Sequence, residues 1–196
     1  AWYADNGYPD CVVESSSEIR DKRLVLTVKV QEGEKVLFGA SDFTGDILYD
    51  KETLKKRLSY REGEPFSKSK FEGSLASLKR LYFEDGFIAT TIVPIPEKRG
   101  SAMHFTYRIS PGEKFTIAEV RVVGNTVTKD KVIRREITLA PGDLFSGSKV
   151  QKSFNKLRDL DYFEKIDIYP KVSGDTTADL FVDVKEKERT GLFAFG

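Results

Sequence analysis

The sequence contains few of the residues on which catalytic and metal sites depend. Its 196 residues include one cysteine and one histidine, which allow neither an internal disulfide nor a zinc cluster. We expect Cys11 to be a small buried strand residue and His104 to lie on the surface face of a strand. No catalytic motif or phosphate-binding glycine loop is evident, so the sequence predicts neither an enzyme nor a cofactor.

An excess of charge of either sign is also missing. Lys+Arg (32) and Asp+Glu (31) nearly cancel, which gives no electrostatic reason to expect nucleic acid or an anionic membrane as a partner. The chain has no apolar run of about 18 residues, and AWYADNGYPD at its start lacks the regions of a signal peptide. Hydrophobic residues (39%) and charged residues (32%) occur in the proportions of a globular protein.

What the sequence does contain is an internal repeat. LAPGDLFSGSK at residues 139–149 repeats the skeleton of SYREGEPFSKSK, so that Gly142 lies 79 positions after Gly63 and Lys149 lies 79 positions after Lys70. A third copy follows at an offset of 75, where Leu180, Val182 and Val184 correspond to Phe105, Tyr107 and Ile109. The four lost residues make about one helical turn. The deletion therefore predicts a helix at that place.

The third copy shows the order of elements in one unit. An alternating β-branched run ends at the turn signal Gly124-Asn125. We expect Thr128 to cap a first helix whose apolar face contains Ile133 and Ile137.

A second helix and a hairpin complete the unit. Ser146 is expected to cap this helix, whose apolar positions are Val150, Phe154, Leu157 and Leu160. We expect Phe154 and Leu157 to face the sheet, so that truncating either to alanine costs about 2–5 kcal/mol. Two alternating runs joined by SGDT predict the hairpin. The order strand, helix, helix, strand, strand predicts an α+β fold in which two helices cover one face of a three-stranded sheet.

The repeats divide the chain into successive parts. These are the end of one unit (1–33), two complete units (34–113 and 114–189) and a short C-terminal piece (190–196). Only short joins separate the units. Gly33 and Gly112 are candidate hinges between them, although a turn glycine with positive φ explains both equally well.

The units resemble POTRA domains in four features: the βααββ order, the GN after the first strand, the Gly-Asp step before the second helix, and the Leu-x-x-Leu-x-Tyr-Phe that ends it. The third unit, with VDVKEKERTGLFAFG, resembles the membrane-proximal POTRA domain of BamA-type outer-membrane protein assembly factors. The resemblance implies tandem POTRA repeats, each with a three-stranded mixed sheet, on the periplasmic face of the outer membrane of a Gram-negative bacterium. It also implies that residues 190–196 begin the first strand of a β-barrel.

The implied function is assembly without covalent catalysis, with unfolded outer-membrane proteins and accessory lipoproteins as partners. A free sheet edge can pair with an extended chain through main-chain hydrogen bonds, and in POTRA domains the strand after the second helix lies at such an edge. An ordinary edge strand without a ligand is the alternative. The candidate client-binding residues are Thr90, Thr91, Ile92, Val93, Ile166, Asp167 and Ile168.

A second candidate surface is Arg134-Arg135-Glu136, beside the apolar face of the first helix. The resemblance implies that this helix docks accessory lipoproteins, whereas charged helix residues in general form a solvated face. Some family members carry an acidic residue before the following glycine. This chain has Pro141 there, which argues against carrying over the family's ion pairs at this position.

Three other functions remain open. The chain is also compatible with the POTRA region of a related transporter, for two-partner secretion, autotransporter assembly or organelle import. Transporters with two POTRA domains fit poorly, because a third unit is visible in residues 1–33. An RNA-binding module needs a basic face with exposed aromatic residues or a GXXG loop, and neither is evident. An enzyme needs a paired nucleophile and base, which the sequence does not show.

Overall fold

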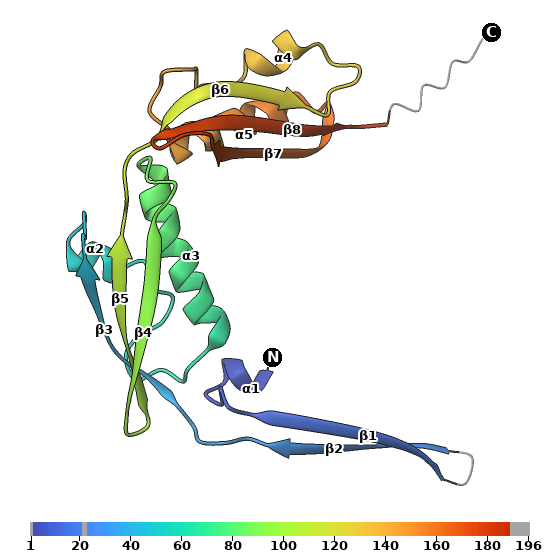
Figure 1. Cartoon of the computed structure of the whole chain (residues 1–196). Coiled ribbons are helices and arrows are strands. Elements are labelled where there is room, and N and C mark those ends of the chain that lie inside the picture. The colour runs from blue at the N-terminus through green and yellow to red at the C-terminus, as the bar shows by residue number, and fades with distance from the viewer. Residues whose placement is uncertain (1, 21–22, 189–196) are drawn as a thin grey trace. The chain divides into compact units, whose positions relative to one another are not determined.

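The computed structural model describes residues 2–20 and 23–188. Residues 190–196, for which we predicted the start of a barrel strand, lie outside this part of the chain. Among the helices of the described residues, none has the length and apolarity that crossing a membrane requires. Figure 1 labels the elements, which are, in chain order, α1 (Trp2–Asp5), β1 (Val12–Arg20), β2 (Arg23–Gln31), β3 (Leu37–Gly45), α2 (Lys51–Lys55), α3 (Lys68–Glu84), β4 (Thr91–Arg99), β5 (Ala102–Ser110), β6 (Thr116–Val123), α4 (Asp130–Arg134), α5 (Gly147–Asp159), β7 (Phe163–Val172) and β8 (Thr177–Glu186).

The strands of the described residues form three separate sheets. One is the hairpin β1-β2, and the other two have the orders β3-β5-β4 and β6-β8-β7. In each three-stranded sheet, the strand that comes last in the chain lies in the centre. It pairs parallel with the strand that comes first and antiparallel with the strand that comes second. Both repeats therefore have the order strand, helix, helix, strand, strand. This confirms the predicted α+β fold with mixed three-stranded sheets.

Contacts group the chain into two compact units. Unit 1 contains Ala1–Arg80 and Thr91–Pro111, and unit 2 contains Leu81–Thr90 and Gly112–Gly196. The end of α3 and the loop after it belong to unit 2, because Phe83 packs against the core of that unit.

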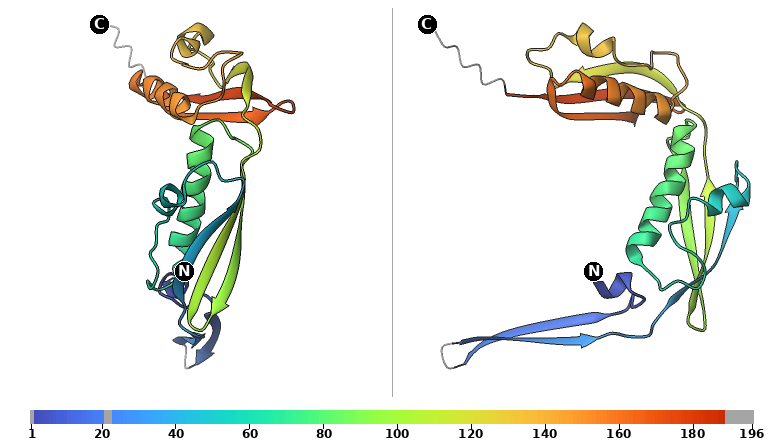
Figure 2. Two further views of the ribbon diagram at one scale, coloured as in Figure 1. Left: turned by 90° about the vertical axis from the view of Figure 1, so that its left-hand side faces the viewer. Right: turned by 180° about the vertical axis from the view of Figure 1, so that it is seen from behind.

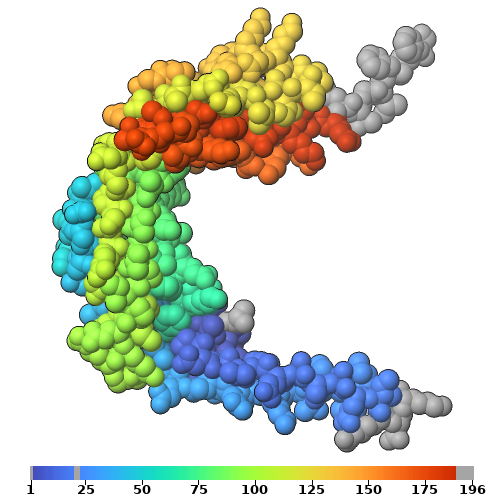
Figure 3. Space-filling model, in the orientation of Figure 1, coloured from blue at the N-terminus to red at the C-terminus, as the bar shows by residue number. Residues whose placement is uncertain are grey.

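In unit 2, α5 covers one face of the β6-β8-β7 sheet and α4 lies beside β6 (Figure 2). The core combines Ile133 of α4, Leu157 of α5 and Leu180 of β8, each 0% exposed. Figure 3 shows part of β8, in red, at the molecular surface. The apolar face of this sheet is thus buried under helices, as the alternating pattern of its strands predicts.

The buried side of α5 differs by one position from the prediction. Leu157 is fully buried as expected, but Phe154 is only half-buried and does not belong to the hydrophobic core that the described residues form. Ser153 takes the core-facing position instead. Its Oγ accepts a hydrogen bond from the backbone N–H of Thr138 at 2.9 Å and donates to the carbonyl of Lys149 at 2.9 Å.

The two predicted helix caps of the third repeat have different outcomes. Ser146 caps α5 as predicted, because its Oγ accepts from the backbone N–H of Lys149 at 3.4 Å. The prediction that Thr128 caps α4 was wrong. The N-cap residue is Lys129, whose side chain has no acceptor, and the N–H of Thr128 donates to Glu186 at 2.6 Å.

In unit 1, α3 covers the β3-β5-β4 sheet (Figure 1) and the core is rich in aromatic rings. Phe38 stacks on Tyr60 with 3.7 Å between ring centroids, and Phe43 stacks on Tyr107 at 5.5 Å. Three hydroxyls are linked within this core: Tyr60 Oη lies 2.9 Å from Ser41 Oγ and 2.7 Å from Tyr107 Oη. The polar atoms of these buried rings are therefore satisfied.

Two predictions for single residues need correction. Cys11 precedes β1 and is half-buried, so the expected buried strand residue was wrong. His104 lies in β5 and is also half-buried. Its Nδ1 accepts a hydrogen bond from the backbone N–H of Ala40 at 3.0 Å, where the β3-β5 register is interrupted. The imidazole thus satisfies a strand N–H that the interruption would leave unpaired.

Candidate functional site

The predicted client strands lie at sheet edges. β4 and β7 are outer strands of their sheets, as the resemblance implied. Thr90 does not belong to the edge, because it precedes β4 and its backbone N–H donates to the carbonyl of Phe87 at 3.4 Å. The other six candidate residues lie within the two strands.

Two prolines limit what the β4 edge can offer. Pro94 and Pro96 lie within an unbroken antiparallel register with β5. Because proline has no N–H to give to β5, its nitrogen must lie on the free side of the strand. Alternate residues share this orientation. Between Ile92 and Lys98, the free edge therefore presents carbonyl groups and no N–H group.

The β7 edge is less restricted. By the same argument Pro170 directs its nitrogen to the free side, so Ile166 and Ile168 direct their N–H and C=O groups there as well. Their side chains pack against the core. On the opposite face, Lys165 and Asp167 form an ion pair at 2.6 Å, and the Asp167 carboxylate raises the pKa of Lys165. β7 thus offers two alternate residues, Ile166 and Ile168, that an extended chain can pair with.

The other outer strands, β3 and β6, are partly closed by their own units. In β6, the backbone N–H of Ile117 donates to the carbonyl of Asp143 at 2.8 Å, and Phe38 of β3 makes the corresponding bond in unit 1. Farther along β6, the Arg134 guanidinium donates to the carbonyl of Val120 at 2.8 Å. These bonds make β7 the more accessible edge of unit 2.

The three residues of the predicted docking surface have different environments. α4 ends at Arg134, so that Arg135 is its C-cap and Glu136 follows the helix. Arg134 pairs with Asp130 in addition to its bond to β6, so it serves the fold. Arg135 and Glu136 pair with each other at 2.9 Å, and the Arg135 side chain is 62% exposed. Arg135 is therefore the residue of the three that a partner can reach.

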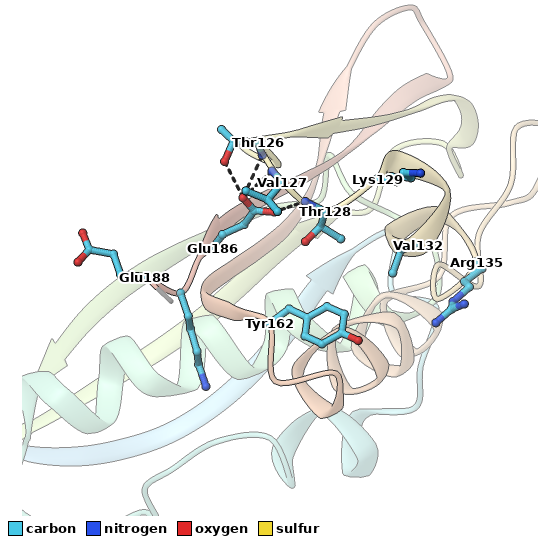
Figure 4. A pocket seen from close by; sticks show the side chains of 10 residues that line it. Thr126, Val127, Thr128, Lys129, Val132, Arg135, Tyr162, Glu186 and Glu188 are labelled. Carbon is cyan, nitrogen blue, oxygen red and sulfur yellow. Dashed lines mark hydrogen bonds between the residues drawn. The ribbon is translucent and has the colours of Figure 1, made fainter. Parts of the chain in front are cut away.

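Arg135 lines a surface cavity of about 830 Å³ in unit 2 (Figure 4). Lys129 adds a second cation, and Val132 and Tyr162 add apolar surface. The loop at residues 126–128 and the end of β8 complete the lining. These last residues include Lys187 and two glutamates, Glu186 and Glu188. The cavity therefore combines charges of both signs with apolar surface, and its cations Lys129 and Arg135 lie on the side of α4 that carries the predicted docking residue.

Glu186, at the end of β8, fixes the 126–128 loop beside this cavity (Figure 4). Its carboxylate accepts hydrogen bonds from the hydroxyl of Thr126 at 2.6 Å, and from the backbone N–H groups of Thr126, Val127 and Thr128 at 2.6–3.1 Å. These hydrogen bonds hold the pKa of Glu186 well below its usual range, and the bond from the Thr126 hydroxyl contributes most. The carboxylate is thus charged at neutral pH and anchors one wall of the cavity.

Sequence reasoning missed Glu186, although the repeat contained a signal for it. In the second repeat, Asp50 caps α2 by accepting from the backbone N–H of Thr53 at 2.8 Å. The third repeat has Lys129 at the position of Asp50, so this carboxylate is lost, and at an offset of 75 Glu186 replaces Pro111. The third repeat thus loses the acid that caps the first helix and gains an acid that holds the loop before this helix.

The two candidate hinge glycines have left-handed backbone conformations. φ is +77° at Gly33 and +73° at Gly112, a region that favours glycine. A Cβ on Gly112 would meet nothing within 4 Å. The conformation alone therefore accounts for this glycine, and the hinge role of both residues stays a prediction.

Tandem βααββ repeats, each with an open edge strand, define a class of modular α+β proteins. The family described as "Surface antigen variable number repeat", POTRA, matches residues 36–112 and 115–187. The chain therefore belongs to the POTRA family.

Curated relatives extend the similarity to nearly the whole chain. The chain is 30% identical over 204 residues to a putative outer membrane protein assembly factor of Treponema pallidum, and 31% identical over 195 residues to the outer membrane protein assembly factor BamA of Neorickettsia risticii. These alignments cover 98% and 96% of this chain, but 24% and 26% of the relatives. The chain thus spans about a quarter of the length of these proteins.

Solved structures with the same fold include BamA fragments. POTRA domains 3–5 of Haemophilus influenzae BamA match with a TM-score of 0.80 at 20% identity, over 94% of this chain and 76% of that one. BamA of Haemophilus ducreyi lacking POTRA domains 1–3 matches with a TM-score of 0.60 at 19% identity, over 77% of this chain and 29% of that one. At these identities the likeness supports the fold.

Proposed function

We propose that this chain is the periplasmic part of an outer-membrane protein assembly factor in a Gram-negative bacterium. It acts without covalent catalysis, as a scaffold that receives unfolded outer-membrane proteins. Support comes from its POTRA family membership and from relatives named as outer membrane protein assembly factors. The observation that carries the client contact is the β7 edge, where Ile166 and Ile168 direct N–H and C=O groups away from β8.

In this proposal, an extended client segment adds to β7 as a fourth strand of the sheet. Main-chain pairing requires no particular side chain, so one edge can serve many clients. Binding is weak, because few residues pair and the client loses conformational entropy when it becomes ordered. Weak binding also allows the client to be passed on. The β4 edge contributes less, since Pro94 and Pro96 leave it without donors between Ile92 and Lys98.

Replacing Ile168 by proline tests this edge. The substitution removes one N–H on the free side and no ladder hydrogen bond, so the fold should persist. A peptide of alternating apolar and polar residues should bind about fivefold more weakly, which corresponds to one net hydrogen bond. The measurement is peptide-induced amide shifts in β7 by NMR. Ile168→Val keeps the N–H and is the matched control.

A second proline variant checks the assigned orientation. Asp167→Pro would remove an N–H that bonds to β8, so it should disrupt the β7-β8 hairpin. If the folded Ile168→Pro variant binds the peptide unchanged, or if the shifts map to α5, main-chain pairing at β7 is the wrong mechanism.

The cavity beside Arg135 is the proposed docking site for an accessory lipoprotein. Lys129 and Arg135 suit a partner carboxylate, and Tyr162 suits an apolar anchor. Arg135→Glu reverses the charge at this cavity and should weaken lipoprotein binding by about tenfold or more in a titration. Arg158→Glu is the control, because Arg158 is similarly exposed (61%) and also pairs with its neighbour, on α5. Equal losses of lipoprotein affinity in both variants would show that the effect comes from net charge and not from this cavity.

A further inference from the structure

Unit 1 contains an apolar groove of about 340 Å³ beside β4. We call it the proline groove. Its side walls are Pro9, Phe66, Phe71, Pro94, Pro96 and Met103. The floor includes Phe105, which is 5% exposed. Ring contacts fix these walls, because Phe105 lies 4.6 Å from Phe71 and 6.4 Å from Phe66 between centroids. The groove is therefore preformed.

Unit 2 fills the equivalent space with its own side chains. Phe83 and Ile88 pack against the core of that unit, and the Phe83 ring meets Phe145 edge-on at 4.8 Å. The residues 79 positions earlier are Ala4 and Pro9. Unit 1 thus keeps the phenylalanine of the wall, Phe66, but has the smaller Ala4 and Pro9 in place of the two large side chains. The structure of unit 2 itself shows which kind of group occupies this site.

The lining of the proline groove selects an apolar occupant. Every lining residue is apolar, so a bound side chain gains dispersion contacts and burial, and a polar one would lose its hydration without compensation. An apolar cavity of about 150 Å³ can hold benzene. The larger, open proline groove accepts an aromatic ring while the main chain that carries it runs along β4.

The neighbouring β4 edge also favours recognition of a client through the client's side chains. Pro94 and Pro96 belong both to the groove wall and to the β4 edge, where they offer no N–H to a client. A client at this edge is therefore held mainly by its side chains. This contrasts with β7, whose free N–H and C=O groups favour main-chain pairing.

We propose that the proline groove binds an aromatic side chain of an extended client segment, at the place equivalent to the one that Phe83 occupies in unit 2. The proposal rests on the proposed function and adds a substrate preference to it. Clients with an aromatic residue on an apolar strand face are held at unit 1, whereas β7 of unit 2 is indifferent to that residue.

Met103 provides a direct probe, because it is the only methionine of the 196 residues. A ¹³C-methyl label on methionine therefore gives one signal from the groove wall. Two peptides of alternating apolar and polar residues are compared, identical except for a central Phe or Ala. The Phe peptide should shift the Met103 signal through the ring current, and should bind about tenfold more tightly than the Ala peptide.

A variant that fills the groove supplies the control. Ala4→Phe with Pro9→Ile reproduces the side chains that fill this space in unit 2, so the Phe peptide should no longer shift Met103 while β7 amides still respond. If this double variant does not fold, Pro96→Glu places a charge at the exposed rim and should have the same effect. Both variants retain the β7 edge.

The outcomes separate the groove from the proposed function. Equal affinity of the two peptides, or an unmoved Met103 signal while β7 amides shift, overturns the groove proposal and leaves the proposed function intact. A Met103 shift caused by raising the protein concentration alone assigns the groove to self-association and also overturns it. No response at either site overturns both.

Discussion

At the scale of single residues, the two repeats differ by coordinated exchanges. The three linked hydroxyl residues of the second repeat are all replaced by apolar residues in the third. Burial raises the pKa of Tyr60 and of Tyr107, so their hydroxyls stay neutral in the core. A single exchange would leave one buried hydroxyl without its partner, which explains why the set changes together. The replaced set is Ser41, Tyr60 and Tyr107, and the replacing set is Val120, Leu139 and Val182.

A glycine at the end of β6 gives the first stability prediction. Gly124 has φ +85°, and a Cβ there would lie 2.0 Å from the carbonyl oxygen of Val184. Gly124→Ala should therefore lower the free energy of unfolding by about 2–4 kcal/mol in urea denaturation. Gly142 is the matched control. It has φ +91° with nothing within 4 Å of the added Cβ, so alanine there should cost only the backbone term, about 1–2 kcal/mol. Equal losses of stability in the two variants would show that the positive φ of Gly124, and not the close approach of Val184, is what requires glycine there.

At the scale of elements, α5 shows how far hydrophobic spacing predicts a helix. The apolar period located the helix, and its cap at Ser146 was also predictable from the sequence. The predicted buried face was wrong by one position. It contained Phe154, whereas the helix buries Ser153, a polar residue that an apolar pattern does not count. Ser74 is the buried serine of α3. A serine recurring at the repeat offset of 79 in two helices was the available signal.

The burial of α5 leads to a revised prediction. Leu157→Ala should lower the free energy of unfolding by about 2–5 kcal/mol, because Leu157 is 0% exposed in the core. Phe154→Ala should cost less than half as much, since Phe154 is half-buried and lies outside the core. Urea denaturation of both variants measures the difference. A loss for Phe154→Ala as large as that for Leu157→Ala would contradict the assigned face.

The directions of the backbone N–H groups at the edge strands and the role of Glu186 beside the cavity could not be predicted from the sequence. The repeat and the family resemblance predicted that β4 and β7 are edges, since the order of elements determines the sheet. They did not predict which way each backbone N–H points, because that depends on the register with the central strand. Pro94 within the predicted strand was a warning that donors would be missing there. The role of Glu186 depends on an approach between residues 58–60 positions apart, which no local pattern encodes.

At the scale of the whole molecule, the β1-β2 hairpin is the part whose burial differs most from the repeats. The apolar residues of β2 at one strand face, Leu24, Leu26, Val28 and Val30, are 73%, 64%, 52% and 40% exposed. Their equivalents 79 positions later include Phe105, Tyr107 and Ile109, which are 5%, 0% and 0% exposed. The same pattern of apolar positions is thus buried in one repeat and open in the hairpin. In the second repeat, two helices cover this face, and the first strand pairs with β5 within the sheet.

We therefore propose that residues 1–33 are the end of a further POTRA repeat, whose first strand pairs with β2 and whose two helices cover the apolar face of β2. The prediction concerns Leu26→Ser. In the present chain the substitution should leave the free energy of unfolding within about 0.5 kcal/mol, because Leu26 is already exposed. In a protein extended upstream by the preceding repeat, the same substitution should cost about 2–5 kcal/mol, since it would then remove a buried side chain.

The control is Val25→Ser, on the opposite face of β2, where alternation places residues that the added helices would not cover. It should change the stability of both proteins little. Denaturation of the two proteins with each variant, together with hydrogen exchange of the β2 amides, makes the comparison. If Leu26→Ser costs no more in the extended protein than in the present chain, another part of the protein or a partner covers this face, and the assignment of residues 1–33 to a POTRA repeat fails.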